Sequence, residues 1–366
     1  MLRFAERTGI LSSGNGRRYL WTDAFAVCTF LGLARATGES RYTDLAVALV
    51  DRVHRALGRH RPDDPRVGWV SGLGEDEGAR HPTCGGLRIG KDLPERAPAE
   101  PFDEALEWER DGQYFHYLTK WMHALDQTSR FTRRPELNVW ARELARTAHA
   151  AFAYGPLGPE RRMVWKMSID LKRPLVPSMG QHDPLDGLIT CLQLDATARQ
   201  LAAPVRPDLR YEASDFTSML VGRDLATPDP LGIGGLFADA YRIAQLRRAG
   251  AAGQDTLADV LLRAASASLE RYEAALRAVR ARPAEQRLAF RELGLAIGLH
   301  ADAKLRGGPL PSHDLLRDAI IAFWLDPENR RATSWTEHRD INEVMLATSL
   351  LPDGFLRLDM GGPPLA

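Results

Sequence analysis

Cysteine is scarce in this sequence of 366 residues, and its three cysteines are widely scattered. Cys28, Cys84 and Cys191 are odd in number and form no CxxC pair, which argues against a disulfide framework and against a compact zinc site. Cys28 and Cys191 lie in apolar runs and are expected in the core, whereas Cys84, in HPTCGG, falls in a loop. A nucleophilic Cys84 stays open, although the sequence pairs no base with it. The sequence predicts no metal site.

Long apolar runs and an excess of either charge are also missing. The most apolar stretch, residues 24–34, is too short to span a bilayer, and the start MLRFAERTG is charged where a signal peptide needs an apolar region. Lysine plus arginine and aspartate plus glutamate number 48 each, so no net field attracts nucleic acid or an anionic membrane. We therefore expect a cytoplasmic protein that binds neither nucleic acid nor membrane.

Strand-like alternation is absent, and helical periodicity dominates the chain. The clearest unit is a hairpin with one helix at residues 22–36, a turn at residues 37–40 and a second helix that ends near residue 57. Gly38 suits the end of the first helix and Ser40 the start of the second. Further helices are expected at residues 107–131, 136–152, 183–201, 213–221, 233–248, 255–276, 284–299, 312–324 and 336–350. The pattern predicts an all-α protein of about eleven helices in six pairs.

One member of each helical pair is apolar on all sides. The stretches AFAVCTFLGLA, LAFRELGLAIGLHA and INEVMLATSLL are of this kind, whereas ARELARTAHAAF carries its charges on one face. A helix that is apolar all round is surrounded by protein. Six such pairs that close into a ring would place the apolar helices in an inner barrel, which predicts one toroid domain over residues 1–366.

Two long connections interrupt the helical pattern at residues 58–106 and 155–182, and both are rich in glycine and proline. Long connections inside a compact domain are usually functional, because specific contacts must satisfy their backbone. Both precede an expected inner helix. We therefore expect the two loops at the same end of the toroid, around its mouth.

Six helical hairpins with a buried inner ring resemble the (α/α)6 toroid of the six-hairpin glycosidase superfamily. The resemblance covers residues 21–350 and is clearest in the turn ARATGESRYTDLA and in the acidic and aromatic stretch EWERDGQYFHYLTKW, residues 107–121. It implies a carbohydrate-active enzyme that acts on a small-molecule or oligosaccharide substrate without a cofactor. Terpene cyclases and lanthionine cyclases use the same toroid, but Asp63 and Asp64 lie in a loop and TCGG lacks the histidine beside a cysteine that a zinc site needs.

Carboxylates at the toroid mouth are the expected catalysts. Glycoside cleavage needs one carboxylic acid that protonates the leaving oxygen and a second carboxylate that acts as base or nucleophile. Asp111 is the first choice because the following Gly112 leaves room for a ligand, and Glu107 lies one helical turn earlier. We expect Asp111 to be buried near a second acid, with a raised pKa. The catalytic candidates are Asp111, Glu107, Asp186, Glu337 and Asp340.

Helix capping explains some of these acids equally well. In HDPLDG, Asp183 suits an N-cap and Asp186 the first helical turn. In SWTEHRD, Ser334 and Glu337 have the spacing of a capping box.

Aromatic and basic side chains near the same helix starts are the expected binding residues. Tryptophan covers the apolar face of a sugar, and cations on the loop GGLRIGKDLPER would meet an acidic sugar. The binding candidates are Trp69, Arg88, Lys91, Trp108, Gln113, His116, Trp165, His182 and His338.

Two other functions stay open at this point. One is a sugar isomerase or epimerase that resembles the N-acylglucosamine 2-epimerases, with His116, His182 and His338 exchanging protons between about pH 6 and 8. The other is a non-enzymatic helical scaffold that binds a protein or peptide on its concave face. Buried carboxylate pairs would favour the hydrolase, histidine pairs the isomerase, and a mouth without buried acids the scaffold.

Overall fold

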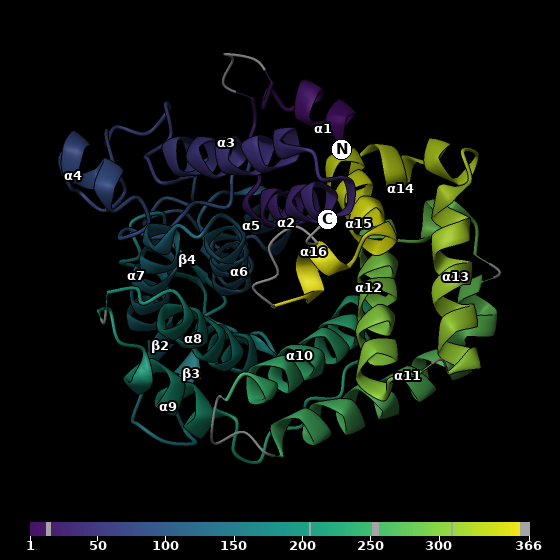
Figure 1. Ribbon diagram of the computed structural model, residues 1–366. Coiled ribbons are helices and arrows are strands. Elements are labelled where there is room, and N and C mark those ends of the chain that lie inside the picture. Colours follow the sequence, from purple (N-terminus) through teal and green to yellow (C-terminus); the bar gives the residue numbers. More distant parts are fainter. Residues whose placement is uncertain (12–15, 205, 251–255, 281, 309, 359–366) are drawn as a thin grey trace. The chain divides into compact units, whose positions relative to one another are not determined.

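The computed structural model describes residues 1–11, 16–204, 206–250, 256–280, 282–308 and 310–358. The described residues form sixteen α-helices and five strands of two or three residues each (Figure 1). The prediction of an all-α protein is confirmed at this level. No helix among the described residues is both long enough and apolar enough to cross a bilayer.

The chain divides into two compact units. The loop-rich unit comprises Leu2–Val27 and Ser40–Gly222, and the helical unit comprises Met1, Cys28–Glu39 and Arg223–Ala366. Helix α2 (Leu20–Thr37) begins in the loop-rich unit and ends in the helical unit. The single closed toroid over residues 1–366 stays a prediction.

The loop-rich unit is built on helix pairs. Its helices are α1 (Leu2–Arg7), α3 (Ser40–Leu57), α4 (Glu75–Arg80), α5 (Glu104–Glu109), α6 (Phe115–Thr132), α7 (Pro135–Phe152), α8 (Asp183–Gln200) and α9 (Arg210–Met219). Helix α6 packs on α7, both pack on α8, and α8 packs on α9. The expected helices at residues 136–152 and 183–201 are confirmed to within one residue at each end.

All five strands lie in this unit, and they form two small antiparallel sheets. One has the order β1 (Gln113–Tyr114), β4 (Lys166–Met167) and β5 (Pro174–Val176). In the other, β2 (Ala153–Tyr154) pairs with β3 (Arg162–Met163). The first sheet joins the segment before α6 to the loop before α8.

The expected helix at residues 107–131 is wrong in its first part. Helix α5 ends at Glu109, the chain is extended through β1, and α6 begins at Phe115. Gly112 has a φ of 149°, and a Cβ there would lie 2.7 Å from the carbonyl oxygen of Met167. A residue with a side chain would be strained at this position. Glu107 and Asp111 therefore do not share one helix face.

The two long loops, residues 58–106 and 155–182, contact each other. The Gln113 side-chain amide donates to the carbonyls of Gly85, at 3.0 Å, and Ile169, at 2.7 Å, so it joins both loops. The Arg96 guanidinium donates to the Leu175 carbonyl at 3.1 Å. These hydrogen bonds use the polar atoms of the buried Gln113 side chain, which favours a structural role over the expected contact with substrate. The placement of the loops at a toroid mouth stays a prediction.

The helical unit contains the remaining helices. These are α10 (Pro230–Arg248), α11 (Leu257–Arg280), α12 (Ala289–Arg306), α13 (Pro311–Leu325), α14 (Thr333–Thr336), α15 (Arg339–Leu350) and α16 (Asp353–Leu356), with 3-10 turns at Ala284–Gln286 and Asn329–Arg331. Helix α12 packs on α10, α13 and α15 (Figure 1). It is buried on nearly every side along Ala289–Leu299. The all-round apolar pattern of this helix therefore predicted its burial correctly. The expected start of α11 at residue 255 lies outside the described residues.

Helices α10 and α12 cross at glycines. A Cβ on Gly298 would lie 2.3 Å from the Cα of Gly234 and 2.4 Å from its carbonyl oxygen. Because backbone atoms cannot rotate away, we expect Gly298→Ala to lower the free energy of unfolding by about 1–3 kcal/mol in urea denaturation. Gly235→Ala is the matched control, because Gly235 is exposed on α10 and a Cβ there has no neighbour within 4 Å. This control should raise the free energy of unfolding by up to about 1 kcal/mol. Equal effects of Gly298→Ala and Gly235→Ala would contradict the close crossing of the two helices.

Candidate functional site

Aromatic side chains gather at the N-terminal end of α6 in the loop-rich unit. The buried Tyr114 ring stacks on His116, with ring centres 5.3 Å apart, and lies 5.3 Å from the half-buried Trp165. Trp165 and His116 are nearly parallel at 5.8 Å, and Trp108 meets Trp165 edge-on at 4.8 Å. These four rings, of Trp108, Tyr114, His116 and Trp165, form an aromatic wall. Trp108 is 45% exposed, so the wall extends from the interior to the surface.

Two further tyrosines extend this aromatic wall. The Tyr117 ring lies 5.1 Å from Tyr114, and its hydroxyl is 2.7 Å from the Tyr19 hydroxyl. Burial raises the pKa of Tyr19, so the phenol stays protonated at neutral pH. The Lys91 ammonium lies 5.7 Å from the centre of the Tyr19 ring, within the range of a cation–π contact. The wall thus combines apolar faces, hydroxyl groups and one cation.

Two carboxylates from the first turn of α8 lie beside the wall. The Asp183 Oδ1 atom is 3.9 Å from His116 Nδ1, and Asp183 Oδ2 accepts a hydrogen bond from the Gly180 backbone N–H at 3.0 Å. The Asp186 carboxylate forms an ion pair with the Lys120 ammonium at 3.0 Å. Lys120 lies on α6, so the packing of α6 on α8 brings the two charges together. Asp183 is buried, whereas Asp186 is half-buried.

The protonation of this group is unusual. Burial, and to a lesser degree the neighbouring charge of Asp186, raise the pKa of the Asp183 carboxyl to about 7, although the Gly180 N–H and Lys120 act in the opposite direction. Burial also lowers the pKa of His116 to about 4, so its imidazole is neutral above that pH. One helical turn thus holds a carboxyl that is protonated near neutrality and an ion-paired carboxylate. Two acids in such different environments can divide acid and base roles between them.

The Asp183 carboxyl should make stability depend on pH. Its pKa is about 7 in the folded chain and 3.8 for an ordinary aspartate, so the folded state binds this proton more tightly. The resulting stabilisation is complete below about pH 4 and is lost as the pH rises through 7. The Asn side chain of Asp183→Asn does not titrate, so the variant does not show this fall in unfolding free energy. Between pH 4 and pH 8 the variant should therefore gain up to about 4 kcal/mol in unfolding free energy relative to the wild type.

Urea denaturation of both proteins at pH 4.5, 6 and 8 measures this difference. The same Asp→Asn change at Asp63, whose pKa is lowered by a hydrogen bond from Arg61, is the matched control and should show no such gain. If the unfolding free energies of the wild type and Asp183→Asn differ by the same amount at all three pH values, the raised pKa is contradicted.

Asp111, the first-choice catalyst, is buried as expected, but its partners are two arginines and a backbone N–H and not a second acid. Its Oδ2 atom lies 2.5 Å from Arg88 Nη1 and 3.4 Å from Arg61 Nη1, and Oδ1 accepts from the Gly90 N–H at 2.9 Å. Arg88 also donates to two backbone carbonyls at 2.7 Å. Cations and a backbone amide thus occupy the place where a second acid was expected. This favours a structural role for Asp111 and Arg88.

Glu107 is held in a similar buried ion pair. Its Oε1 atom lies 2.9 Å from Lys166 Nζ, and its Oε2 atom accepts from Arg96 Nε at 2.9 Å. The fully buried Lys166 also donates to the carbonyls of Glu107, at 2.6 Å, and Arg110, at 2.8 Å. The pair joins α5 to β4 and favours a structural role for Glu107.

Three candidates belong to the helical unit and not to the unit of the aromatic wall. Glu337 and His338 are exposed, and Asp340 is half-buried in the first turn of α15. The expected capping box is wrong, because α15 begins at Arg339 and the Ser334 hydroxyl donates instead to the Ala284 carbonyl at 2.6 Å. The structure does not assign these residues a ligand.

Trp69 packs inside the loop that carries it. Its ring is buried against Gly78, where a Cβ would lie 2.2 Å from it, and the Arg59 guanidinium covers it at 4.5 Å. These contacts indicate a core residue of the loop.

The sequence predicted part of the aromatic wall but did not place Asp183 among the catalytic candidates. The expected residues that lie in or next to the wall are Lys91, Trp108, His116, Trp165 and Asp186, and His182 is the N-cap residue of α8. The missed residues are Asp183, Lys120, Tyr19, Tyr114 and Tyr117. The sequence leaves Asp183 open between a helix cap and a residue of the mouth; in the structure the N-cap residue of α8 is His182, and the Asp183 side chain accepts from Gly180, upstream of the helix. The acid pair in HDPLDG was the signal that pointed to it.

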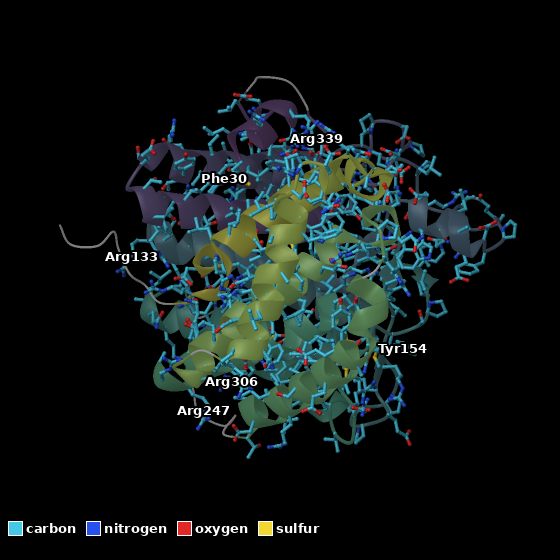
Figure 2. All side chains as sticks on the ribbon, turned by 90° about the vertical axis from the view of Figure 1, so that its right-hand side faces the viewer. Phe30, Arg133, Tyr154, Arg247, Arg306 and Arg339 are labelled. Atoms are coloured by element: carbon cyan, nitrogen blue, oxygen red, sulfur yellow. The ribbon has the colours of Figure 1, made fainter. Side chains whose placement is uncertain are left out.

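Two other places in the chain do not have the chemistry of this site. Burial raises the pKa of the Cys84 thiol to about 12, which makes it a poor nucleophile at neutral pH. A shallow groove of about 560 Å³ lies between α10, α11 and α12 in the helical unit, and Arg247 and Arg306, labelled in Figure 2, are among its lining residues. Its described lining contains no aromatic ring, so it does not match a sugar-binding surface.

No protein-family model matches this chain, and no curated protein is significantly similar to it. The chemistry of the site is therefore inferred from its geometry.

Proposed function

We propose that this chain is a carbohydrate-active enzyme, a glycoside hydrolase of the cytoplasm that acts on a small-molecule or oligosaccharide substrate. Its acid and base chemistry would come from Asp183 and Asp186, and its sugar contacts from the aromatic wall. The proposal includes a closed (α/α)6 toroid similar to that of the six-hairpin glycosidases. The observation that carries it is the buried Asp183 carboxyl, with a pKa raised to about 7, beside an ion-paired carboxylate and partly exposed tryptophans.

Each group has a role in the proposed reaction. Asp183, whose pKa of about 7 leaves about half of it protonated at neutral pH, donates its proton to the glycosidic oxygen as the bond to the anomeric carbon breaks. Asp186, whose carboxylate is ion-paired with Lys120, attacks the anomeric carbon as the nucleophile. Water then cleaves the resulting glycosyl ester and gives a proton to Asp183, which restores both acids. Side chains three residues apart on a helix have Cβ atoms about 5–6 Å apart, which suits the shorter carboxyl separation of retaining enzymes. Trp108 and Trp165 would cover the apolar face of the sugar.

The neutral His116 favours this function over a sugar isomerase. The isomerase hypothesis requires histidines that gain and lose protons between about pH 6 and 8. With a pKa of about 4, His116 stays neutral over that range. A neutral imidazole 3.9 Å from Asp183 does not compete for the proton of the carboxyl.

A panel of chromogenic glycosides and uronides, assayed between pH 4 and 9, tests the proposal. Hydrolysis of at least one substrate is expected, with activity that falls as the pH rises through about 7 because Asp183 loses its proton. Free sugars incubated in parallel and analysed by NMR test for isomerisation. Isomerised free sugar without any glycoside hydrolysis would contradict the proposal, as would activity that increases steadily from pH 6 to 9.

A further inference from the structure

A second polar group lies elsewhere in the loop-rich unit, where the end of α4 meets α7. It consists of His81, Cys84 and Glu143, whose nitrogen, sulfur and oxygen atoms all lie within 4.8 Å of one another. None of the three belongs to the aromatic wall or to the acid pair of α8. Two of them are close in sequence, in the pattern His-x-x-Cys, and the third comes from the middle of α7.

Hydrogen bonds hold the backbone of this group against α7. The Trp140 indole N–H donates to the Arg80 carbonyl at 2.8 Å, and the Thr83 hydroxyl donates to the Trp140 carbonyl at 2.7 Å. Two turns further along α7, the Thr147 hydroxyl donates to the Cys84 carbonyl at 3.0 Å. The segment that carries His81 and Cys84 is therefore fixed to the helix that carries Glu143, so the three donors are preorganised.

The polar atoms of the group are incompletely satisfied. His81 Nδ1 lies 2.7 Å from Glu143 Oε1, but the buried Glu143 Oε2 atom has no hydrogen-bond partner among the described residues. A buried carboxylate oxygen without a partner costs free energy unless a cation or a donor meets it. Glu77 Oε1 lies 3.6 Å from the other ring nitrogen, His81 Nε2. A carboxylate in that position orients a histidine that binds a metal through its first nitrogen.

We propose that His81, Cys84 and Glu143 bind one Zn²⁺ ion, with water in the fourth position. One nitrogen, one sulfur and one oxygen form a donor set that Zn²⁺ accepts, whereas the thiolate disfavours Mg²⁺ and Ca²⁺. The thiol gives up its proton on binding, and the cation replaces the contact between His81 and Glu143. The sequence predicted no metal site because it has no CxxC pair, but these ligands come from two separate elements. The site does not depend on the proposed hydrolase activity.

Metal binding by the untagged, metal-free protein tests the proposal. Titration with Zn²⁺ in a calorimeter should give one ion per chain, and Zn²⁺ should raise the melting temperature. Co²⁺ should give a near-ultraviolet band from the bond between sulfur and metal. Cys84→Ala should abolish that band and weaken Zn²⁺ binding by at least about a hundredfold, since loss of even an outer carboxylate costs about 10- to 100-fold.

Two more variants separate a ligand role from a general defect. Glu77→Gln should weaken binding by about tenfold and keep the Co²⁺ band, because Glu77 only orients His81. His338→Ala removes an exposed histidine of the helical unit and should leave affinity and stoichiometry unchanged. Circular dichroism of each metal-free variant checks its fold. The proposal is overturned if the wild type binds no stoichiometric Zn²⁺, or if folded Cys84→Ala keeps both the wild-type affinity and the Co²⁺ band.

Discussion

Asp183→Asn is expected to lower turnover of any glycoside that the protein hydrolyses by at least about a hundredfold, with the fold intact. The amide keeps the shape of the side chain and still accepts the hydrogen bond from Gly180, but it cannot donate an acidic proton. General acid catalysis contributes about 10²–10⁴ in rate, so its loss should appear in kcat. The measurement is steady-state kinetics on a substrate found with the glycoside panel, together with circular dichroism.

Asp195→Asn is the matched control for this variant. Asp195 is a half-buried aspartate on the same helix, about 18 Å further along its axis at 1.5 Å per residue. Its replacement should change kcat less than about threefold. Wild-type turnover in folded Asp183→Asn, or an equal loss in Asp195→Asn, would exclude Asp183 as the acid.

Lys166→Met is expected to lower the free energy of unfolding by about 3–5 kcal/mol, which is the cost of breaking a buried ion pair on one side. The Lys166 side chain is fully buried, and it holds the Glu107 carboxylate and two backbone carbonyls. Methionine fills a similar volume but leaves these acceptors with fewer donors. Urea denaturation at pH 7 measures the loss.

The exposed Lys172 offers a matched control for the same substitution. Its side chain is 83% exposed, and Lys172→Met should change stability by less than about 0.5 kcal/mol. The double variant Lys166→Met with Glu107→Gln should recover part of the loss, because the uncompensated charge is then gone. A loss below about 1 kcal/mol for Lys166→Met would contradict the structural role of this pair.

Helical periodicity predicted the long amphipathic helices well, because packing on one face imposes a period that the sequence displays. The helices α7 and α8 also begin with proline in the first turn, which marks their starts. The interruption before α6 was missed because Gly112 was interpreted as a glycine inside a helix. Strands β1 and β4 are only two residues long, so they have no periodicity that a sequence could show.

The sequence predicted which helix starts form the site, but not which side chains contact one another there. Residues that begin neighbouring helices meet in space, so the starts of α6 and α8 could be chosen from the sequence. The side chains that contact each acid could not be predicted from the sequence, because they depend on how distant loops fold. Asp111 meets Arg61, 50 residues earlier, whereas Asp183 is buried beside His116 and near the charge of Asp186. Burial decides which of these carboxyls keeps its proton, and burial is a property of the tertiary structure.

A direct titration of the Asp183 carboxyl tests the central claim, which is that one acid beside the aromatic wall keeps its proton near neutral pH. Protein labelled with ¹³C at the aspartate carboxyl carbons is titrated by NMR from pH 3 to 9, and Asp183→Asn identifies the Asp183 signal. The Asp183 signal is expected to titrate near pH 7, far above an ordinary aspartate, and to be missing from the variant. An Asp183 signal that titrates near pH 4 would contradict it.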